Sequence, residues 1–130
     1  MDLPTGNWTA NFSGVEGTLV LETFRQGGDF GGKMLRPDIE GGMMLIAGMW
    51  DGTAQKLTFA ARHPGNQTVD DEWLEAYLIV TPRNAVPGQD VTLTLVGSIS
   101  VINVTQLPKY NSANARRATF GWFAEMRVIS

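Results

Sequence analysis

The sequence predicts a nearly all-β domain over residues 1–130. The simplest arrangement is an eight-stranded antiparallel up-and-down β-barrel, with a two-sheet β-sandwich as the alternative. Two observations favour this fold class. Fifteen glycines and six prolines divide the chain into short segments, and these segments are rich in Val, Ile, Leu, Thr, Phe and Trp, which is typical of strands. No segment sustains a helical period, and the best helix candidate, 70–76, is short.

Turn signals set the order of the predicted strands. Gly-Gly at 27–28 and Asp-Gly at 51–52 indicate tight turns, and Pro-Gly at 64–65 and 87–88 ends two further segments. Strands are predicted at 6–12, 17–26, 29–35, 43–50, 56–63, 72–81, 91–104 and 118–129. Eight strands in this order can close into a barrel, which removes exposed edges and leaves an interior wide enough for side chains or one small ligand.

The polarity of alternate residues differs between strands. Segment 91–101 carries Val and Leu on one face and mainly Thr and Ser on the other, as a half-buried strand does. Segments 43–50 and 118–129 are apolar on both faces. A strand that is covered on both sides needs a cover outside the barrel, and a second copy of the protein is the expected one. We therefore expect a homo-oligomer.

The composition excludes several classes of function. The net charge is -3, and no segment concentrates Lys or Arg, so nucleic acid is not an expected partner. Cysteine is absent, which excludes disulfides and thiolate metal sites. The longest apolar runs fall far short of the ~20 residues of a membrane-spanning helix, so no membrane partner is expected. No signal peptide is visible at the start, and the compartment stays open.

Catalytic chemistry finds little support in the sequence. His63 is the only histidine, and no cysteine, phosphate-binding glycine loop or Gly-X-Ser-X-Gly motif is present. A general base at His63 is conceivable, but a hydrogen-bonded histidine at a strand end is favoured. Asp70, Asp71, Glu72 and Glu75 could share acid–base work, but a solvated loop leading into a strand is favoured. We predict no catalytic residue, no metal ligand and no cofactor, and therefore not an enzyme.

Five short motifs resemble the avidin and streptavidin family of calycin-type barrels. They are Thr-Gly-Asn-Trp-Thr at 5–9, Gly-Asp-Phe-Gly-Gly at 28–32, Leu-Ile-Ala-Gly at 45–48, Leu-Thr-Phe at 57–59 and Arg-Ala-Thr-Phe-Gly at 117–121. Their order matches that of the family across nearly the whole chain. The resemblance implies a streptavidin-like barrel that binds a small ligand.

The residues that the resemblance implies for biotin do not match. Family members hold the ureido oxygen with an Asn, a Ser and a Tyr from the first three strands. Here Asn11 stands one position late, Ser13 precedes Gly14 instead of following it, and Met34 occupies the place of the Tyr. A ureido group without these donors would leave buried polar atoms unpaired, at about 1–3 kcal/mol each. We expect the framework to be similar and the ligand to differ.

The candidate ligand-binding residues combine aromatic walls with a few hydrogen-bonding groups. They are Asn11, Phe30, His63, Trp73 and Trp122. A core or interface role remains the simpler explanation for any single tryptophan. Strand parity is the only guide to which of these residues face inward, and one bulge inverts it.

The family resemblance also predicts which end of the barrel is open. We expect Trp8 to plug the closed end and the loops around 36–41, 64–71 and 108–116 to border the open end. The leading hypothesis is a non-catalytic binding protein with a small organic ligand in an avidin-like barrel. The alternative is a protein-interaction or inhibitor module whose barrel is filled with side chains.

Overall fold

The computed structural model describes residues 2–39, 41–64, 72–107 and 112–129, with the backbone alone for 102–107 and 112–117. Its strands are β1 (Gly6–Phe12), β2 (Val15–Phe24), β3 (Asp29–Leu35), β4 (Met43–Asp51), β5 (Lys56–Arg62), β6 (Glu72–Thr81), β7 (Asp90–Leu107) and β8 (Ser112–Ile129). Each strand pairs with the next, and β8 pairs antiparallel with β1, so the sheet is closed. The predicted eight-stranded antiparallel barrel is confirmed. Within the described ranges, no helix is long and apolar enough to cross a membrane.

Local chemistry explains why the turns fall where they do. The Asp51 carboxylate accepts hydrogen bonds from the backbone N–H groups of Thr53 and Ala54, at 2.9 and 3.0 Å, which forms an Asx-type turn between β4 and β5. Gly27 and Gly28 both have φ near +98°, a left-handed conformation that glycine adopts without steric cost. These turns fix the hairpin register and therefore decide which residues of each strand face inward.

Apolar side chains fill the inward positions of the barrel. The largest of those with no more than 1% exposure are Trp8, Phe12, Leu19, Leu21, Met34, Met44, Leu57, Leu93 and Leu95. No polar or charged side chain is buried among the residues that the structure describes. A barrel of eight strands is just narrow enough for side chains to pack its interior in this way.

Trp8 lies at the end of the barrel where β1 begins. It is fully buried, and its indole N–H donates to the carbonyl of Pro4 at 3.4 Å. Leu3 is 5% exposed and belongs to the same core. The predicted plug at this end is therefore present.

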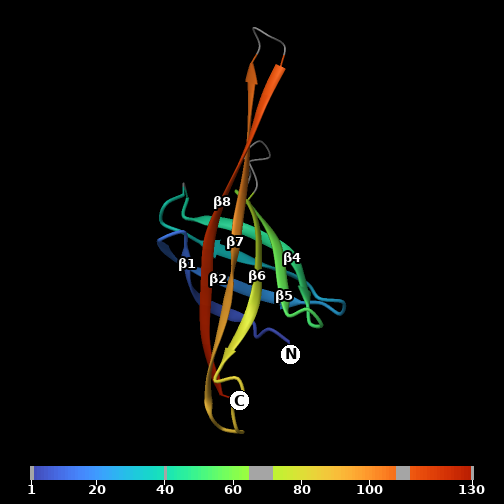
Figure 1. The fold of residues 1–130 in the computed structure, drawn as a ribbon, viewed down its shortest axis with the longest axis vertical. Helices are drawn as coiled ribbons and strands as arrows, with labels where there is room; N and C mark the ends of the chain where they lie inside the picture. Colours follow the sequence, from blue (N-terminus) through green and yellow to red (C-terminus); the bar gives the residue numbers. More distant parts are fainter. Residues whose placement is uncertain (1, 40, 65–71, 108–111, 130) are drawn as a thin grey trace.

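The opposite end, where β1, β3 and β5 end and β2, β4 and β6 begin, is the mouth end. From it a hairpin of β7 and β8 projects far beyond the other strands (Figure 1). Its pairing continues from Ile102 opposite Arg117 to Leu107 opposite Ser112. The sequence analysis placed the start of this last strand at 118, because the run of Ala, Asn, Arg and Ser before it lacks the composition of a strand.

Candidate functional site

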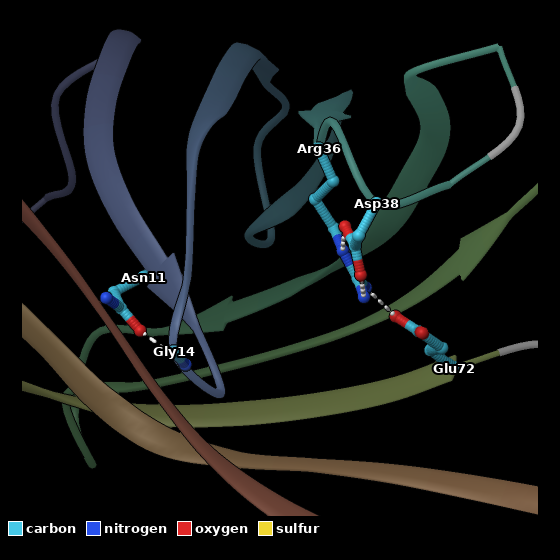
Figure 2. A network of polar contacts seen from close by, with 5 residues as sticks. All are labelled: Asn11, Gly14, Arg36, Asp38 and Glu72. Carbon is cyan, nitrogen blue, oxygen red and sulfur yellow. Dashed lines mark hydrogen bonds and ion pairs between the residues drawn. The ribbon is translucent and has the colours of Figure 1, made fainter.

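Three charged side chains meet at the mouth end (Figure 2). Arg36 follows directly after β3, and its Nη1 donates to Oε2 of Glu72 at 2.7 Å. Its Nε and Nη2 donate to the two carboxylate oxygens of Asp38 at 3.0 and 2.8 Å. The Arg36 side chain is only 10% exposed and the Glu72 side chain 14%. Because β4 and β5 separate β3 from β6 in the sheet, this ion pair ties together two strands that do not pair.

The turn after β3 holds Arg36 in place through its backbone. The Arg36 N–H donates to the Gly42 carbonyl at 2.9 Å, and the Gly42 N–H donates to the Ile39 carbonyl at 3.0 Å. Gly42 has φ +70°, which favours glycine at this position. The guanidinium is therefore positioned by a folded turn and by two carboxylates.

A row of aromatic rings lies beneath the guanidinium. Arg36 Cζ lies 5.6 Å from the centre of the Phe12 ring, within the range of a cation–π contact. Phe12 stacks on Trp122 with ring centres 5.9 Å apart, and Phe59 meets Trp122 edge-on at 5.7 Å. Phe30 meets Phe59 at 6.0 Å. The mouth thus places a charge cluster, with Arg36 and Glu72 largely covered and Asp38 34% exposed, on an aromatic core.

The charges of the cluster stabilise one another. The hydrogen bond from Arg36 lowers the pKa of the Asp38 carboxyl. Burial opposes the charge on Arg36, but the hydrogen bond to Asp38 and the charges of Glu72 and Asp38 outweigh it, so the pKa of Arg36 is raised. The pairing of Arg36 with Asp38 therefore favours the charged form of both groups.

His63 lies directly after β5 at the same end of the barrel. It continues the inward positions Leu57, Phe59 and Ala61. The residue is half-buried, and its Nδ1 is buried without a hydrogen-bond partner among the described residues. Among the residues that the structure describes, no group of three or more His, Asp or Glu side chains could hold a metal ion.

The structure separates the five predicted ligand-binding residues into two groups. Phe30 and Trp122 are 6% and 3% exposed and face the interior, and His63 reaches the mouth. Trp73 is 56% exposed on the outer face of β6. Asn11 also lies on the outer side, where its side-chain oxygen accepts the N–H of Gly14 at 2.7 Å in the β1–β2 turn. Asn11 and Trp73 are therefore not brought together with the other three.

Sequence reasoning missed two residues of the mouth. Arg36 was named only as part of a bordering loop, and Glu72 was interpreted as part of a solvated acidic segment. Parity could have found them, because Arg36 lies two residues after the buried Met34 and Glu72 two residues before the buried Leu74. Of the loops 64–71 and 108–116, which were expected to border the open end, residues 65–71 and 108–111 lie outside the described residues, and 112–116 belong to β8.

A second feature lies on the outer face of β4–β8. Tyr77 pairs with Val96, and Val96 pairs with Phe123, so these three exposed residues lie side by side. Next to them a hollow of 470 Å³ is bordered by Met49 and Trp73, with small residues between them. This face carries exposed apolar side chains among polar and charged ones such as Lys56 and Glu75.

Comparisons with known proteins agree with the architecture. No protein-family model matches the chain, and no curated protein sequence does. Among solved structures, the rhizavidin–biotin complex is similar with a TM-score of 0.61 at 10% identity, covering 100% of both chains. Apo shwanavidin is similar with a TM-score of 0.60 at 11% identity, covering 97% of this chain and 98% of that one. A low-affinity mutant of shwanavidin gives 0.59 at 12% identity, with the same coverage. The chain therefore has the closed eight-stranded barrel fold of the avidin-type proteins.

Proposed function

We propose that this protein is a non-catalytic binding protein that holds a small organic ligand at the mouth end of its avidin-type barrel. The observation that carries the proposal is the charge cluster of Arg36, Asp38 and Glu72, in which Arg36 lies on the face of Phe12. Binding sites for small molecules combine apolar and aromatic walls with a few fixed polar groups. His63 adds a ring nitrogen that has no partner among the described residues.

The packing of the interior favours a site at the mouth over one deep in the barrel. Met34, Met44 and Leu95 are fully buried inside it. A ligand there would have to displace well-packed side chains, which costs stability. At the mouth the same ligand would meet Arg36, Glu72 and His63 instead. The ligand is accordingly one that needs polar contacts at one end.

The similarity to a biotin complex supports the proposal that this chain binds a small molecule. It does not support biotin as that molecule. Rhizavidin is the protein bound to biotin in that structure. In the present chain, Met34 is a buried thioether where the resemblance implies a tyrosine. Ser13 lies in the β1–β2 turn with φ +55°, and Asn11 in β1 accepts the N–H of Gly14 in that turn. The ureido donors are thus replaced by an apolar wall and a turn.

A ligand screen tests the proposal. Native mass spectrometry after gentle purification, followed by thermal-shift measurements, would identify a bound small molecule. His63→Ala should weaken that ligand about tenfold, because one hydrogen bond of about 1.4 kcal/mol is lost, and should leave the melting temperature nearly unchanged. Trp73→Ala is the matched control on the outer face and should leave affinity unchanged. A ligand that responds to Trp73→Ala and not to His63→Ala would contradict a site at the mouth.

The outer face supports a second proposal, a homodimer. Seven large apolar side chains on this face are 43–56% exposed. Tyr77, Val96 and Phe123 among them are contiguous across β6, β7 and β8, and a contiguous exposed apolar patch marks an interaction surface. The seven residues are Leu45, Met49, Trp73, Tyr77, Ile79, Val96 and Phe123.

The proposed interface includes residues of 43–50 and 118–129, the segments that are apolar on both faces, but also residues of β6 and β7. Trp122 faces the core at 3% exposure, and Met126 packs partly buried against it, so neither is an interface residue. Tyr77→Lys should convert dimer to monomer in sedimentation velocity, because it places a charge at the centre of the apolar face. Val86→Lys, 63% exposed in the β6–β7 loop, is the control and should stay dimeric. A wild-type chain that sediments as a monomer at high concentration would overturn the dimer.

A further inference from the structure

We propose that the edge of β8 at residues 112–120, here called the β8 edge, is a docking site for an extended, acidic peptide segment of another protein. The segment would pair with β8 and become the third strand of the projecting hairpin, a mode of peptide recognition in which the backbone supplies the main contacts. The β8 edge is separate from the small-molecule site and from the apolar outer face, so this inference goes beyond the proposed function.

The last two strands extend far past the strands beside them (Figure 1). β7 and β8 pair along their whole length without a register shift. On one side, β1 pairs with β8 only at residues 122–125. On the other side, the first residue of β6 lies opposite Val101 of β7. Within the described ranges, residues 112–120 of β8 therefore pair with β7 alone.

The base of this ribbon is uncovered on both faces as well as at its edge. Ala118, Thr119 and Phe120 are all exposed, although successive residues of a strand point to opposite faces. A two-stranded ribbon without a covered face is at best marginally stable in water, and independent stability needs at least one more strand. The hairpin therefore has the form of a sheet that lacks a partner strand.

One hydrogen bond assigns the backbone groups at the β8 edge. The N–H of Ser13 donates to the carbonyl of Gly121 at 3.0 Å, so Gly121 directs its backbone groups away from β7. These groups alternate in direction along an antiparallel strand, and the unbroken register continues the alternation into the projecting part. The N–H and C=O groups of residues 113, 115, 117 and 119 therefore face the β8 edge. Such a row is a template for pairing with another chain.

The charge of the hairpin selects the kind of strand that pairs with it. All 13 acidic residues of the chain lie outside segment 91–124. The basic residues inside that segment are Lys109, Arg116 and Arg117. Opposite charges on adjoining strands stabilise a sheet, and like charges destabilise it. An incoming strand with Asp or Glu residues is therefore favoured over a neutral or basic one.

A second copy of this chain fits the β8 edge poorly. The barrel is closed, so within the described residues the part of a second copy that still has a free strand edge is its own hairpin. That hairpin carries the same basic residues, and pairing of two copies would place like charges on adjoining strands. A segment of another protein that is acidic is attracted where a second copy is repelled.

A defined peptide tests the proposal in the wild-type protein. The probe is a fluorescent peptide of alternating Val and Thr interrupted by Glu, long enough to pair with residues 113–119. Hydrogen exchange followed by NMR should show that the peptide slows exchange at the amides of residues 113, 115, 117 and 119 by about tenfold or more, because these amides gain hydrogen bonds. Binding without protection of these four amides would overturn the proposal.

Backbone chemistry provides the matched controls. Ala115→Pro removes an N–H that faces the β8 edge, and proline is tolerated on edge strands at such positions. It should weaken the peptide about tenfold or more, whereas Ala115→Thr keeps the N–H and should bind like wild type. If the proline variant loses the hairpin, methylation of alternate backbone nitrogens of the peptide gives the same test on wild-type protein. Of the two alternate methylation patterns, one should abolish binding and the other should not; equal binding of both would overturn the third strand.

Exchange of charge tests the class of partner. A peptide with Lys in place of Glu should bind wild type about tenfold more weakly, and Arg116→Glu/Arg117→Glu should reverse this preference. Equal affinity of the two peptides for wild type would overturn the acidic partner. Protection of the same amides that grows with protein concentration in the absence of peptide would also overturn it, because the occupant would then be a second copy. None of these results depends on the small-molecule ligand.

Discussion

Trp122 joins the aromatic core to the wall of the barrel, and replacing it with alanine tests how the interior is packed. The indole is 3% exposed and contacts the rings of Phe12 and Phe59. Its N–H donates to the carbonyls of Glu75 and Ser98, both at 3.2 Å. Trp122→Ala removes both ring contacts and both hydrogen bonds at once.

The expected cost follows from these contacts. A buried Trp replaced by Ala in a core loses about 3–5 kcal/mol, because transfer energy and a cavity add. For a domain of this size each kcal/mol lowers the melting temperature by about 4 °C. Trp122→Ala should therefore melt about 12–20 °C below wild type. Trp73→Ala, at a site 56% exposed, should stay within about 4 °C.

Calorimetry of the two variants under identical conditions is the assay. Both variants lose the same side chain, so the difference between them reports the burial of Trp122 together with its ring contacts and hydrogen bonds. Trp122→Ala melting within a few degrees of wild type would refute the filled barrel and would indicate an interior cavity in which Trp122 contacts solvent or ligand. A larger loss in Trp73→Ala than in Trp122→Ala would show that the inward and outward faces of β6 and β8 are assigned in reverse.

Two further predictions follow from the charge cluster and from the glycines. Because Arg36 lowers the pKa of Asp38 in the folded state, the stabilisation is complete above the ordinary carboxyl pKa of about 3.9 and is lost as the pH falls through the lowered value. Asp38→Asn should therefore destabilise at pH 7 in urea titrations and cost progressively less below about pH 4; a constant difference would contradict the pairing. Gly97→Ala should cost about 1–3 kcal/mol of unfolding free energy, because a Cβ at residue 97 would overlap the backbone of β6. Gly121→Ala is the control, since nothing lies within 4 Å of its Cβ, and it should change stability by less than about 0.5 kcal/mol in the same titrations. Equal effects of the two substitutions would show that β6 and β7 are not so closely packed.

Much of the fold was predictable because turns and alternation are local properties of the chain. Asp51-Gly52 predicted the β4–β5 turn, and the alternation of 91–101 predicted which face of β7 is buried. The projecting part of β8 was missed, because Ser, Asn and Ala carry no strand signal and only pairing with β7 extends it. Pairing of this kind is not a property of either segment alone.

The site was less predictable because it depends on contacts between distant segments. Arg36 and Glu72 are 36 residues apart, and each is unremarkable in its own segment. Trp73 is prominent in the sequence but faces outward, since its neighbour Leu74 takes the inward position at 3% exposure. A tryptophan is a typical ligand contact, so the sequence suggested this role for Trp73. The alternation of side chains along β6 places Trp73 on the outer face and not in the barrel interior.

Calorimetric titration with biotin tests most directly whether this avidin-type framework carries a different site. We predict binding weaker than micromolar or none, because Met34 offers no hydrogen-bond donor and Asn11 is engaged in the β1–β2 turn, so that the ureido group would lose about 1–3 kcal/mol for each missing partner. Nanomolar affinity for biotin would contradict the account.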